Sequence, residues 1–194
     1  MNTAEPRRAH DRLATTDAAE EDMTHPLFVP RWFFLITALA TATLLAYGYY
    51  LQFHEGLEPC PMCIFQRLCY MAIAATGIIA ATHGPARVAT LAYCGLTTLF
   101  AGIGAAIAGR QVWLQHLPED RIPECGPGLE FMLEVYPLAE VIRTALKGTG
   151  ECATVDWTFA GLSIADWSLI CFVLFSLAHI LFGWRAFRHN GQRA

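Results

Sequence analysis

Four long apolar stretches constrain the fold of this chain more than any other feature of its sequence. The first, residues 32–54, contains no Asp, Glu, Lys or Arg, and about 20 apolar residues are enough for a helix to cross the hydrocarbon core of a bilayer. Three more stretches follow at about 63–82, 88–109 and 167–184, and Arg67 is the only charged residue in them. Charged residues make up 15% of the chain, whereas about 25% is usual in soluble domains. We therefore predict an all-α membrane protein, built as a bundle of four transmembrane helices.

The basic residues predict how this bundle is oriented. Four arginines precede the first stretch, three more lie in the last ten residues, and Arg87 lies in the turn between the second and third stretches. The segment 110–166, by contrast, holds four basic and nine acidic residues. Because loops rich in Lys and Arg stay in the cytoplasm, we expect cytoplasmic termini, with the 55–62 segment and the 110–166 loop on the outer face. The net charge of -4, without a dense basic stripe, argues against a nucleic-acid partner.

The two ends of the chain differ in composition from the membrane part. Residues 1 to about 26 mix both charge signs with Ala, Thr and Pro and show no apolar period, so they bury too little surface to offset the entropy of ordering. A secretory signal is not expected, because the first apolar run is longer than the roughly 7 to 15 apolar residues of such a signal. We predict a disordered cytoplasmic tail over 1–30, a membrane domain over 31–185 and a short cytoplasmic tail over 186–194.

The outer loop contains an amphipathic segment, residues 129–147. Its apolar residues recur at spacings of three and four, the period of a helix with one apolar face: Leu129, Met132, Leu133, Tyr136, Ala139, Ile142 and Leu146. Pro137 interrupts the segment and predicts a kink or a restart of the helix. Two alternatives stay open, a short helix lying on the membrane surface and a helix packed against the bundle.

The seven cysteines divide into two groups by their position. Three lie inside apolar stretches, where a cysteine acts as a small buried hydrophobe: Cys69, Cys94 and Cys171. The other four fall on the predicted outer face, in a compartment that favours disulfides: Cys60, Cys63, Cys125 and Cys152. An even number of cysteines on that face indicates two pairs.

The motif Cys60-Pro61-Met62-Cys63 lies at the outer start of the second helix. Unpaired N–H groups and the helix dipole favour an anion there, so a cysteine at this place should ionise more easily, and the thiolate is the species that attacks disulfides. Arg67 follows Cys63 by four residues, one turn deeper on the same helix face. A charge in mid-membrane costs about 2.5 to 3.5 kcal/mol, so it indicates a functional site. The alternative is an arginine that reaches lipid headgroups with its long side chain.

A lone CxxC motif fits a redox pair, half of a zinc site or an incidental disulfide. Zinc requires a second ligand pair at similar spacing, whereas Cys125 and Cys152 are 27 residues apart; we expect no metal site. Two outer pairs favour a relay instead, in which a mobile pair meets a soluble partner and a helix-anchored pair meets an acceptor in the membrane. Glycines at 126, 128, 148 and 150 give the mobile pair its flexibility.

Together, these motifs resemble the DsbB family of bacterial disulfide-bond formation proteins. The resemblance covers residues 32–185: four spans, PCPMCIFQR at the second helix, PECGPG in the outer loop and GECATVDW before the fourth span. It implies a thiol oxidase of the bacterial cell inner membrane, with its cysteines in the periplasm. The expected acceptor is a membrane quinone, ubiquinone or menaquinone. The expected partner is a soluble periplasmic thioredoxin-fold thiol oxidase, DsbA.

The resemblance also implies a role for each site residue. Cys60 and Cys63 are expected to form the quinone-coupled disulfide, and Cys125 and Cys152 the disulfide that exchanges with the partner. Arg67 is expected to help hold the quinone, with Gln111 and Gln115 near the quinone ring.

Two residues depart from the family pattern. Gln66 stands where an acidic residue is expected, and Gln111 stands where a histidine is frequent. Neither is expected to touch the thiols. Other functions stay open: a related thiol oxidoreductase with a dedicated partner or one that runs toward reduction, a membrane scaffold stapled by inert disulfides, and a small metal-binding membrane module.

Overall fold

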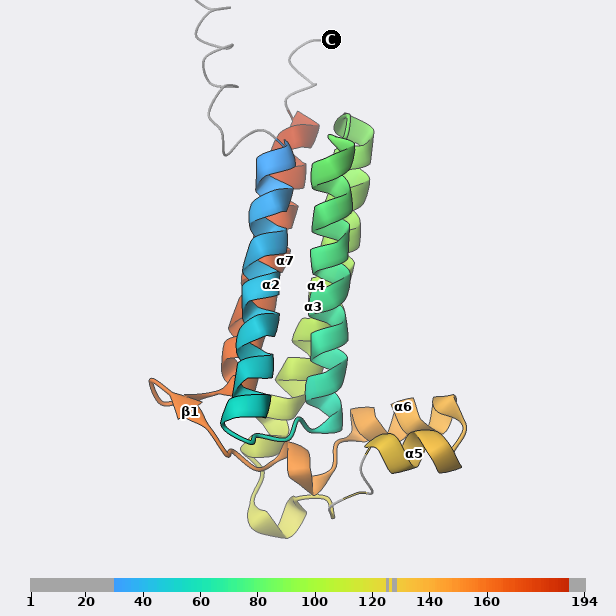
Figure 1. Cartoon of the computed structure of the whole chain (residues 1–194), viewed down its shortest axis with the longest axis vertical. Helices are drawn as coiled ribbons and strands as arrows, with labels where there is room; N and C mark the ends of the chain where they lie inside the picture. The colour runs from blue at the N-terminus through green and yellow to red at the C-terminus, as the bar shows by residue number, and fades with distance from the viewer. Residues whose placement is uncertain (1–29, 125, 127–128, 189–194) are drawn as a thin grey trace, which may run out of the picture.

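Four long helices form the body of the protein. The structure is a computed structural model, and it describes residues 30–124, 126 and 129–188. The helices are α2 (Pro30–His54), α3 (Pro61–His83), α4 (Arg87–Gln115) and α7 (Ile164–Arg188). They run alongside one another, with α2 against α3, α3 against α4 and α4 against α7 (Figure 1). Each is long and apolar enough to cross a membrane, and the prediction of a four-helix membrane bundle is confirmed.

Helix α4 continues six residues beyond the stretch predicted from apolar residues alone. Its added turns hold Leu114, which is fully buried, and Arg110, whose charge does not end the helix. The Arg110 guanidinium lies 4.2 Å from the centre of the Trp113 ring and donates a hydrogen bond to the carbonyl oxygen of Lys147 at 3.0 Å. The arginine therefore finds its partners at the end of the bundle while the other side of the same helix stays apolar.

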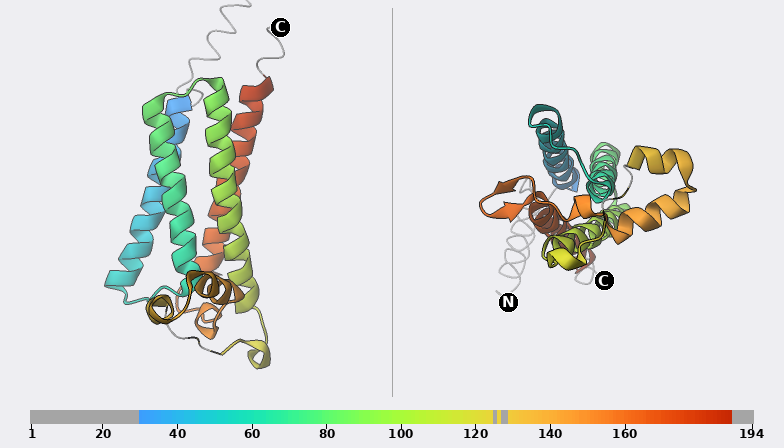
Figure 2. Two further views of the ribbon diagram at one scale, coloured as in Figure 1. Left: turned by 90° about the vertical axis from the view of Figure 1, so that its right-hand side faces the viewer. Right: turned by 90° about the horizontal axis from the view of Figure 1, so that it is seen from below.

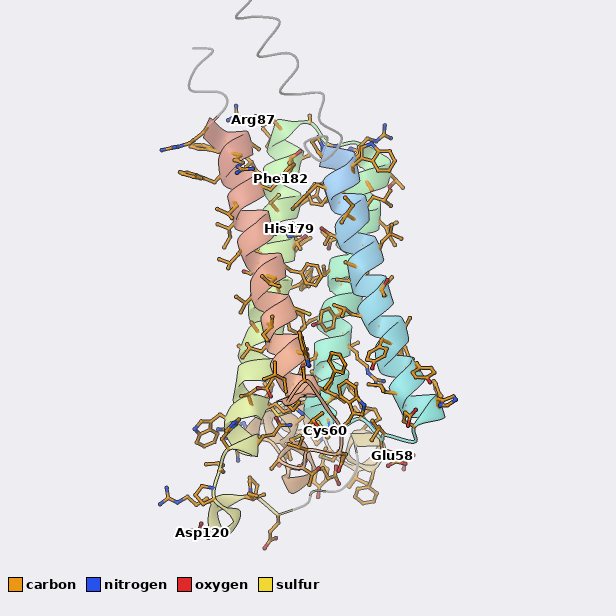
Figure 3. All side chains as sticks on the ribbon, turned by 90° about the vertical axis from the view of Figure 1, so that its left-hand side faces the viewer. Glu58, Cys60, Arg87, Asp120, His179 and Phe182 are labelled. Atoms are coloured by element: carbon orange, nitrogen blue, oxygen red, sulfur yellow. The ribbon has the colours of Figure 1, made fainter. Side chains whose placement is uncertain are left out.

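The two ends of the bundle differ in what they carry. The start of α2, the end of α7 and the turn between α3 and α4 lie at one end (Figure 1). The segment between α2 and α3 and the long loop between α4 and α7 lie at the other (Figure 2). Cys60 and Glu58 are at the loop end, far from Arg87 (Figure 3). The cysteine motif and the loop cysteines thus share one end of the molecule.

The amphipathic segment forms two short helices, α5 (Leu129–Val135) and α6 (Leu138–Lys147), because the chain restarts at Pro137. They extend sideways from the loop end of the bundle (Figures 1 and 2). Met132, Val141 and Ala145 are buried there, so part of the pair packs inward, as the second alternative requires. Other apolar side chains stay exposed, and contact of this face with a membrane surface remains a prediction: Phe131, Leu133, Leu138, Ile142 and Leu146.

A small hairpin before α7 was not expected from the sequence. Strands β1 (Thr158–Phe159) and β2 (Leu162–Ser163) pair antiparallel, and the two turn residues, Ala160 and Gly161, both have positive φ, 53° and 79°. Two-residue strands are too short to show an alternating pattern. The hairpin is tied to α7 by the Trp167 indole N–H, which donates to the carbonyl oxygen of Phe159 at 3.1 Å.

The predicted tails fall largely outside the described residues. Helix α2 begins at Pro30, the last residue of the predicted N-terminal tail, and α7 continues through residues 186–188 of the predicted C-terminal tail. The disorder predicted for the remaining residues of both tails therefore stays a prediction.

Candidate active site

Three cysteine sulfurs meet at the N-terminus of α3. Cys60 precedes the helix with an extended backbone, and Pro61 occupies the first helical position, where its missing N–H costs nothing. The Cys60 sulfur lies 3.1 Å from the Cys63 sulfur and is also within hydrogen-bonding reach of Cys152, so its single S–H can donate to either of them. Cys60 is nearly buried and Cys152 is completely buried. Cys60 is therefore the middle one of three sulfurs contributed by two distant segments.

A tight turn carries Cys152 to this place. Residues Gly150–Cys152 form a 3₁₀ turn, and the Cys152 N–H donates to the carbonyl oxygen of Thr149 at 2.9 Å. Just before it, Gly148 has a φ of 86°, and the Leu114 side chain occupies the space that a Cβ at this position would need. Only glycine satisfies both conditions without strain.

The same turn lies beside the two neighbours of Cys125. The N–H of Gly150 donates to the carbonyl oxygen of Glu124 at 3.2 Å, and a Cβ at Gly126 would lie 2.6 Å from a methyl carbon of Thr149. Cys125 itself lies outside the described residues, so the pairing of Cys125 with Cys152 stays a prediction.

Of the two described thiols outside the membrane-spanning helices, Cys152 is the acidic one, and hydrogen bonding makes it so. Its pKa falls to about 6, chiefly because Cys60 donates a hydrogen bond to its sulfur, and also because the backbone N–H groups of Thr149 and Met62 do so; burial opposes the shift. The pKa of Cys60 is raised, because its thiol is hydrogen-bonded to Cys152 and Cys63 and is buried. Cys60, at the start of α3, is therefore not the more acidic thiol that was expected there; the Met62 N–H at this helix end favours a thiolate at Cys152 instead.

Two glutamine side chains stand behind the Cys60–Cys63 pair. The Gln111 Nε2 atom, from α4, donates to the sulfurs of Cys63 at 3.3 Å and Cys60 at 3.5 Å. The Gln66 Nε2 atom, from α3, donates to the Gln111 Oε1 atom at 2.7 Å. Both side chains are buried. The expectation that neither departure from the family pattern touches the thiols is therefore wrong for Gln111.

The Arg67 guanidinium points across to α2. It donates to the Gln52 Oε1 atom at 2.5 Å and to the carbonyl oxygen of Gly48 at 3.1 Å, and it lies 4.8 Å from the centre of the Tyr49 ring. The carboxylates of the described residues form no ion pair with it. Its partners are all neutral, so Arg67 brings an uncompensated positive charge to the site.

A cavity of about 500 Å³ opens beside these groups. Cys60, Cys63, Arg67, Gln111 and Gln115 line it, and Cys152 lies behind Cys60. The other walls are mainly apolar and come from α2, α7 and the hairpin, including Leu44, Tyr47, Trp157, Phe159 and Trp167. Residues far apart in the sequence thus surround one chamber at the loop end of the bundle.

Gln115 lines the cavity and also links two segments of its wall. Its Oε1 atom lies 2.8 Å from the Ser163 hydroxyl, which also lies 2.8 Å from a carboxylate oxygen of Asp166 in the first turn of α7. Gln115 therefore joins the end of α4 to the start of α7 at the cavity wall.

Several contributors to the site were not predicted as such. Gln52, Gly48 and Thr149 act through contacts with distant segments, which leave no local pattern in a sequence. The available sequence signal for Gln52 was its position as a polar residue near the end of an apolar stretch. That signal does not indicate that Arg67 is its partner.

Comparison with known proteins agrees with this architecture. The family model for disulfide bond formation protein DsbB matches residues 30–182. Disulfide bond formation protein B of Methylococcus capsulatus is 49% identical over 155 residues, which are 80% of this chain and 94% of that protein. The proteins of the same name from Marinobacter nauticus and Stutzerimonas stutzeri are 48% and 46% identical over 144 residues, 74% of this chain and 86% and 88% of theirs. The chain belongs to the DsbB family of membrane disulfide bond formation proteins.

Proposed function

We propose that this protein is a quinone-dependent protein thiol oxidase. It reoxidises a soluble DsbA-like dithiol oxidase of the periplasm and passes the electrons to a membrane quinone, ubiquinone or menaquinone. The observation that carries the proposal is the position of Cys60, whose sulfur touches both Cys63 and Cys152 beside the Arg67 cavity. This arrangement supports transfer of a disulfide between the loop and the helix.

The thiol exchange begins in the loop. A thiolate of the reduced partner attacks Cys125 in a Cys125–Cys152 disulfide, a bond to Cys125 forms, and Cys152 leaves as a thiolate. The low pKa of Cys152 suits this departure, since a more acidic thiol leaves faster. The contacts of Glu124 and Gly126 with the Thr149–Gly150 turn support the pairing of these two loop cysteines.

The next exchange joins the loop to the helix. The Cys152 thiolate attacks Cys60 in the Cys60–Cys63 disulfide, a Cys152–Cys60 bond forms, and Cys63 leaves with the electron pair. The second thiol of the partner then displaces Cys125, and the Cys125 thiolate attacks Cys152 and releases Cys60. The partner has become a disulfide, the loop disulfide is restored, and Cys60 and Cys63 hold the two electrons.

The residues around the cavity fit a quinone head group. Its volume of about 500 Å³ lies within the range of small-molecule sites, about 300 to 1,000 Å³. Arg67 and Gln115 would hold the polar side of the ring and the aromatic walls its apolar faces, while Gln111 would lie beside the ring with its amide bonded to the sulfurs and to Gln66. When bound, a quinone supplies the two-electron, two-proton acceptor for the Cys60–Cys63 dithiol. The uncompensated charge of Arg67 stabilises negative charge that develops near Cys63.

Redox potentials show why such an acceptor is needed. A DsbA-like oxidase has a potential of about -120 mV, and a disulfide comparable with that of protein disulfide isomerase has one of about -180 mV. With about 1.4 kcal/mol for each 30 mV, oxidising the first by the second is uphill by about 2.8 kcal/mol. A strong oxidant in the membrane removes this obstacle.

We also propose that the termini are cytoplasmic and the cysteines periplasmic, in the inner membrane of a bacterial cell. Arg31, Arg87, Arg185 and Arg188 cluster at the end opposite Cys60. This distribution supports the orientation, because cytoplasmic loops carry the excess of Lys and Arg.

The test is quinone reduction by purified protein and a reduced thioredoxin-fold partner, followed by absorbance with ubiquinone and menaquinone in turn. We expect Cys60→Ala and Cys63→Ala to abolish turnover. Cys94→Ala, a change of a buried thiol at the opposite end of α4, serves as the matched control and should retain it. Normal turnover in either of the first two variants would show the assignment to be wrong.

Measurements on the same purified protein distinguish the proposed function from the other candidate functions. A scaffold stapled by inert disulfides predicts no exchange with any reduced partner, and a reductase predicts the opposite direction of electron flow. A metal-binding module predicts stoichiometric metal in the purified protein.

A further inference from the structure

The amide of Gln111 can face the sulfurs with either of its ends. Its nitrogen lies 3.3 Å from the Cys63 sulfur and its oxygen 3.6 Å from the same atom. A half-turn of the amide would therefore exchange a hydrogen-bond donor for an acceptor at almost the same place. An N–H donor stabilises a thiolate, whereas a carbonyl oxygen destabilises it.

Gln66 decides between these two orientations. Its Nε2 atom donates to the Gln111 Oε1 atom at 2.7 Å, which holds the oxygen on the Gln66 side and leaves the Gln111 N–H groups for the sulfurs. Both side chains are only 5% exposed, so bulk water does not offer the amide alternative partners. Hydrogen bonds to a charged acceptor are about twice as strong as neutral ones.

We propose that Gln66 is a positioning residue, which fixes the Gln111 amide with its N–H toward Cys60 and Cys63 and so stabilises the reduced form of this pair. The inference rests on the proposed exchange reaction. When Cys152 attacks Cys60, the Cys60–Cys63 bond breaks, the Cys152–Cys60 bond forms, and the electron pair goes to Cys63. Gln111 stabilises the resulting charge without giving up a proton.

The N–H donor that Gln111 presents to the sulfurs does not change with pH, because neither the Gln66 amide nor the Gln111 amide titrates. The groups lining the cavity that can carry charge are Tyr47, Glu58, Cys60, Cys63, Arg67, Tyr70, Glu151, Asp156 and Cys171. Gln66 and Gln111 act beside them as a fixed donor.

The test is the reduction potential of the Cys60–Cys63 pair in the full-length protein. The protein is equilibrated in glutathione redox buffers at pH 7, free thiols are alkylated, and mass spectrometry reads the state of each cysteine. Loss of the amide orientation in Gln66→Leu should shift the exchange equilibrium about tenfold toward the Cys60–Cys63 disulfide, about 30 mV toward a lower potential. Gln66→Glu should shift it further, because a carboxylate draws the Gln111 N–H groups to itself.

A double-mutant cycle distinguishes positioning from a structural role. Gln111→Leu should shift the equilibrium by at least as much as Gln66→Leu, and adding Gln66→Leu to Gln111→Leu should change nothing more. Alkylation of Cys94, buried between α4 and α7, reports on any variant that fails to fold. An unchanged potential in Gln66→Leu, or an equal effect of Gln66→Leu with and without Gln111, overturns the inference. The measurement needs neither quinone nor partner, so its failure is distinct from failure of the proposed oxidase activity.

Discussion

The acidity of Cys152 is the property of the site that a single measurement can test most directly. Its pKa of about 6, against an ordinary 9.0, depends first on the hydrogen bond from Cys60. We predict that Cys152 of the reduced protein titrates with a pH midpoint near 6: the thiolate is present above this pH and is lost as the pH falls through it. In Cys60→Ala, which removes the main donor, the midpoint should rise toward 9.

The pH midpoint of the Cys152 titration is a more sensitive quantity to measure than the reaction rate of Cys152 at pH 7. At pH 7, a pKa of about 6 gives about 90% thiolate, and a pKa of about 9 gives about 1%. The intrinsic nucleophilicity of a thiolate falls with its pKa, with a Brønsted coefficient of about 0.4 to 0.5, which cancels most of this difference. The net rate at pH 7 then differs by only about fourfold, while the midpoints differ by up to about three units.

The assay follows the ultraviolet absorbance of the thiolate in the reduced protein between pH 4.5 and 9, with the Cys152→Ala variant subtracted to isolate the signal of Cys152. Cys63→Ala is the matched control, because it removes a neighbouring thiol but leaves the donor Cys60 in place; its midpoint should stay near 6. A wild-type midpoint near 9, or equal midpoints in the two variants, would refute the hydrogen-bond explanation.

Four further substitutions test the residues that support the site. Gln52→Leu removes the shortest hydrogen bond of Arg67 and should raise the apparent KM for quinone severalfold with little change in kcat. Arg67→Ala should raise this KM further. Unchanged quinone dependence in both variants would make Arg67 a headgroup anchor. Gly148→Ala meets the Leu114 side chain at a positive φ and should cost about 2 kcal/mol of local stability, seen as about 30-fold faster amide exchange around residue 150. Gly161→Ala, at a positive φ but in open space, should cost only about 1 kcal/mol and leave that exchange unchanged.

The features that sequence predicted well are the local ones. A membrane span follows from the length of an apolar run, so all four helices were expected, and the break at Pro137 follows from the missing N–H of proline. The contact of Cys60 with Cys63 is also local, because residues three apart meet on one helix face. The hairpin over 158–163 escaped prediction because its two-residue strands are fixed by contacts with Trp167 and not by a pattern of their own.

The features that sequence did not predict depend on contacts across the fold. Cys152 reaches Cys60 through the turn at Gly148 and the packing of Leu114, and neither residue marks that contact in the sequence. Gln111 was expected near the quinone ring because of its alignment with the family. Its hydrogen bonds to the sulfurs appear only when α3 and α4 are placed side by side with Gln66 between them.

The hydrogen-bond donors of the site are themselves held by neutral groups. The amide of Gln111 from α4 and the backbone N–H of Met62 point to cysteine sulfurs, while Arg67 from α3 lines the same cavity and points to α2. Their own partners are neutral: Gln52 and a backbone carbonyl for Arg67, and Gln66 for Gln111. A carboxylate in either of these supporting positions would attract the donor and reduce its effect on the thiolate. Neutral supports fix the orientation of each donor and leave its polarity available to the cysteines, which is the condition for electrostatic stabilisation without reorganisation during the reaction.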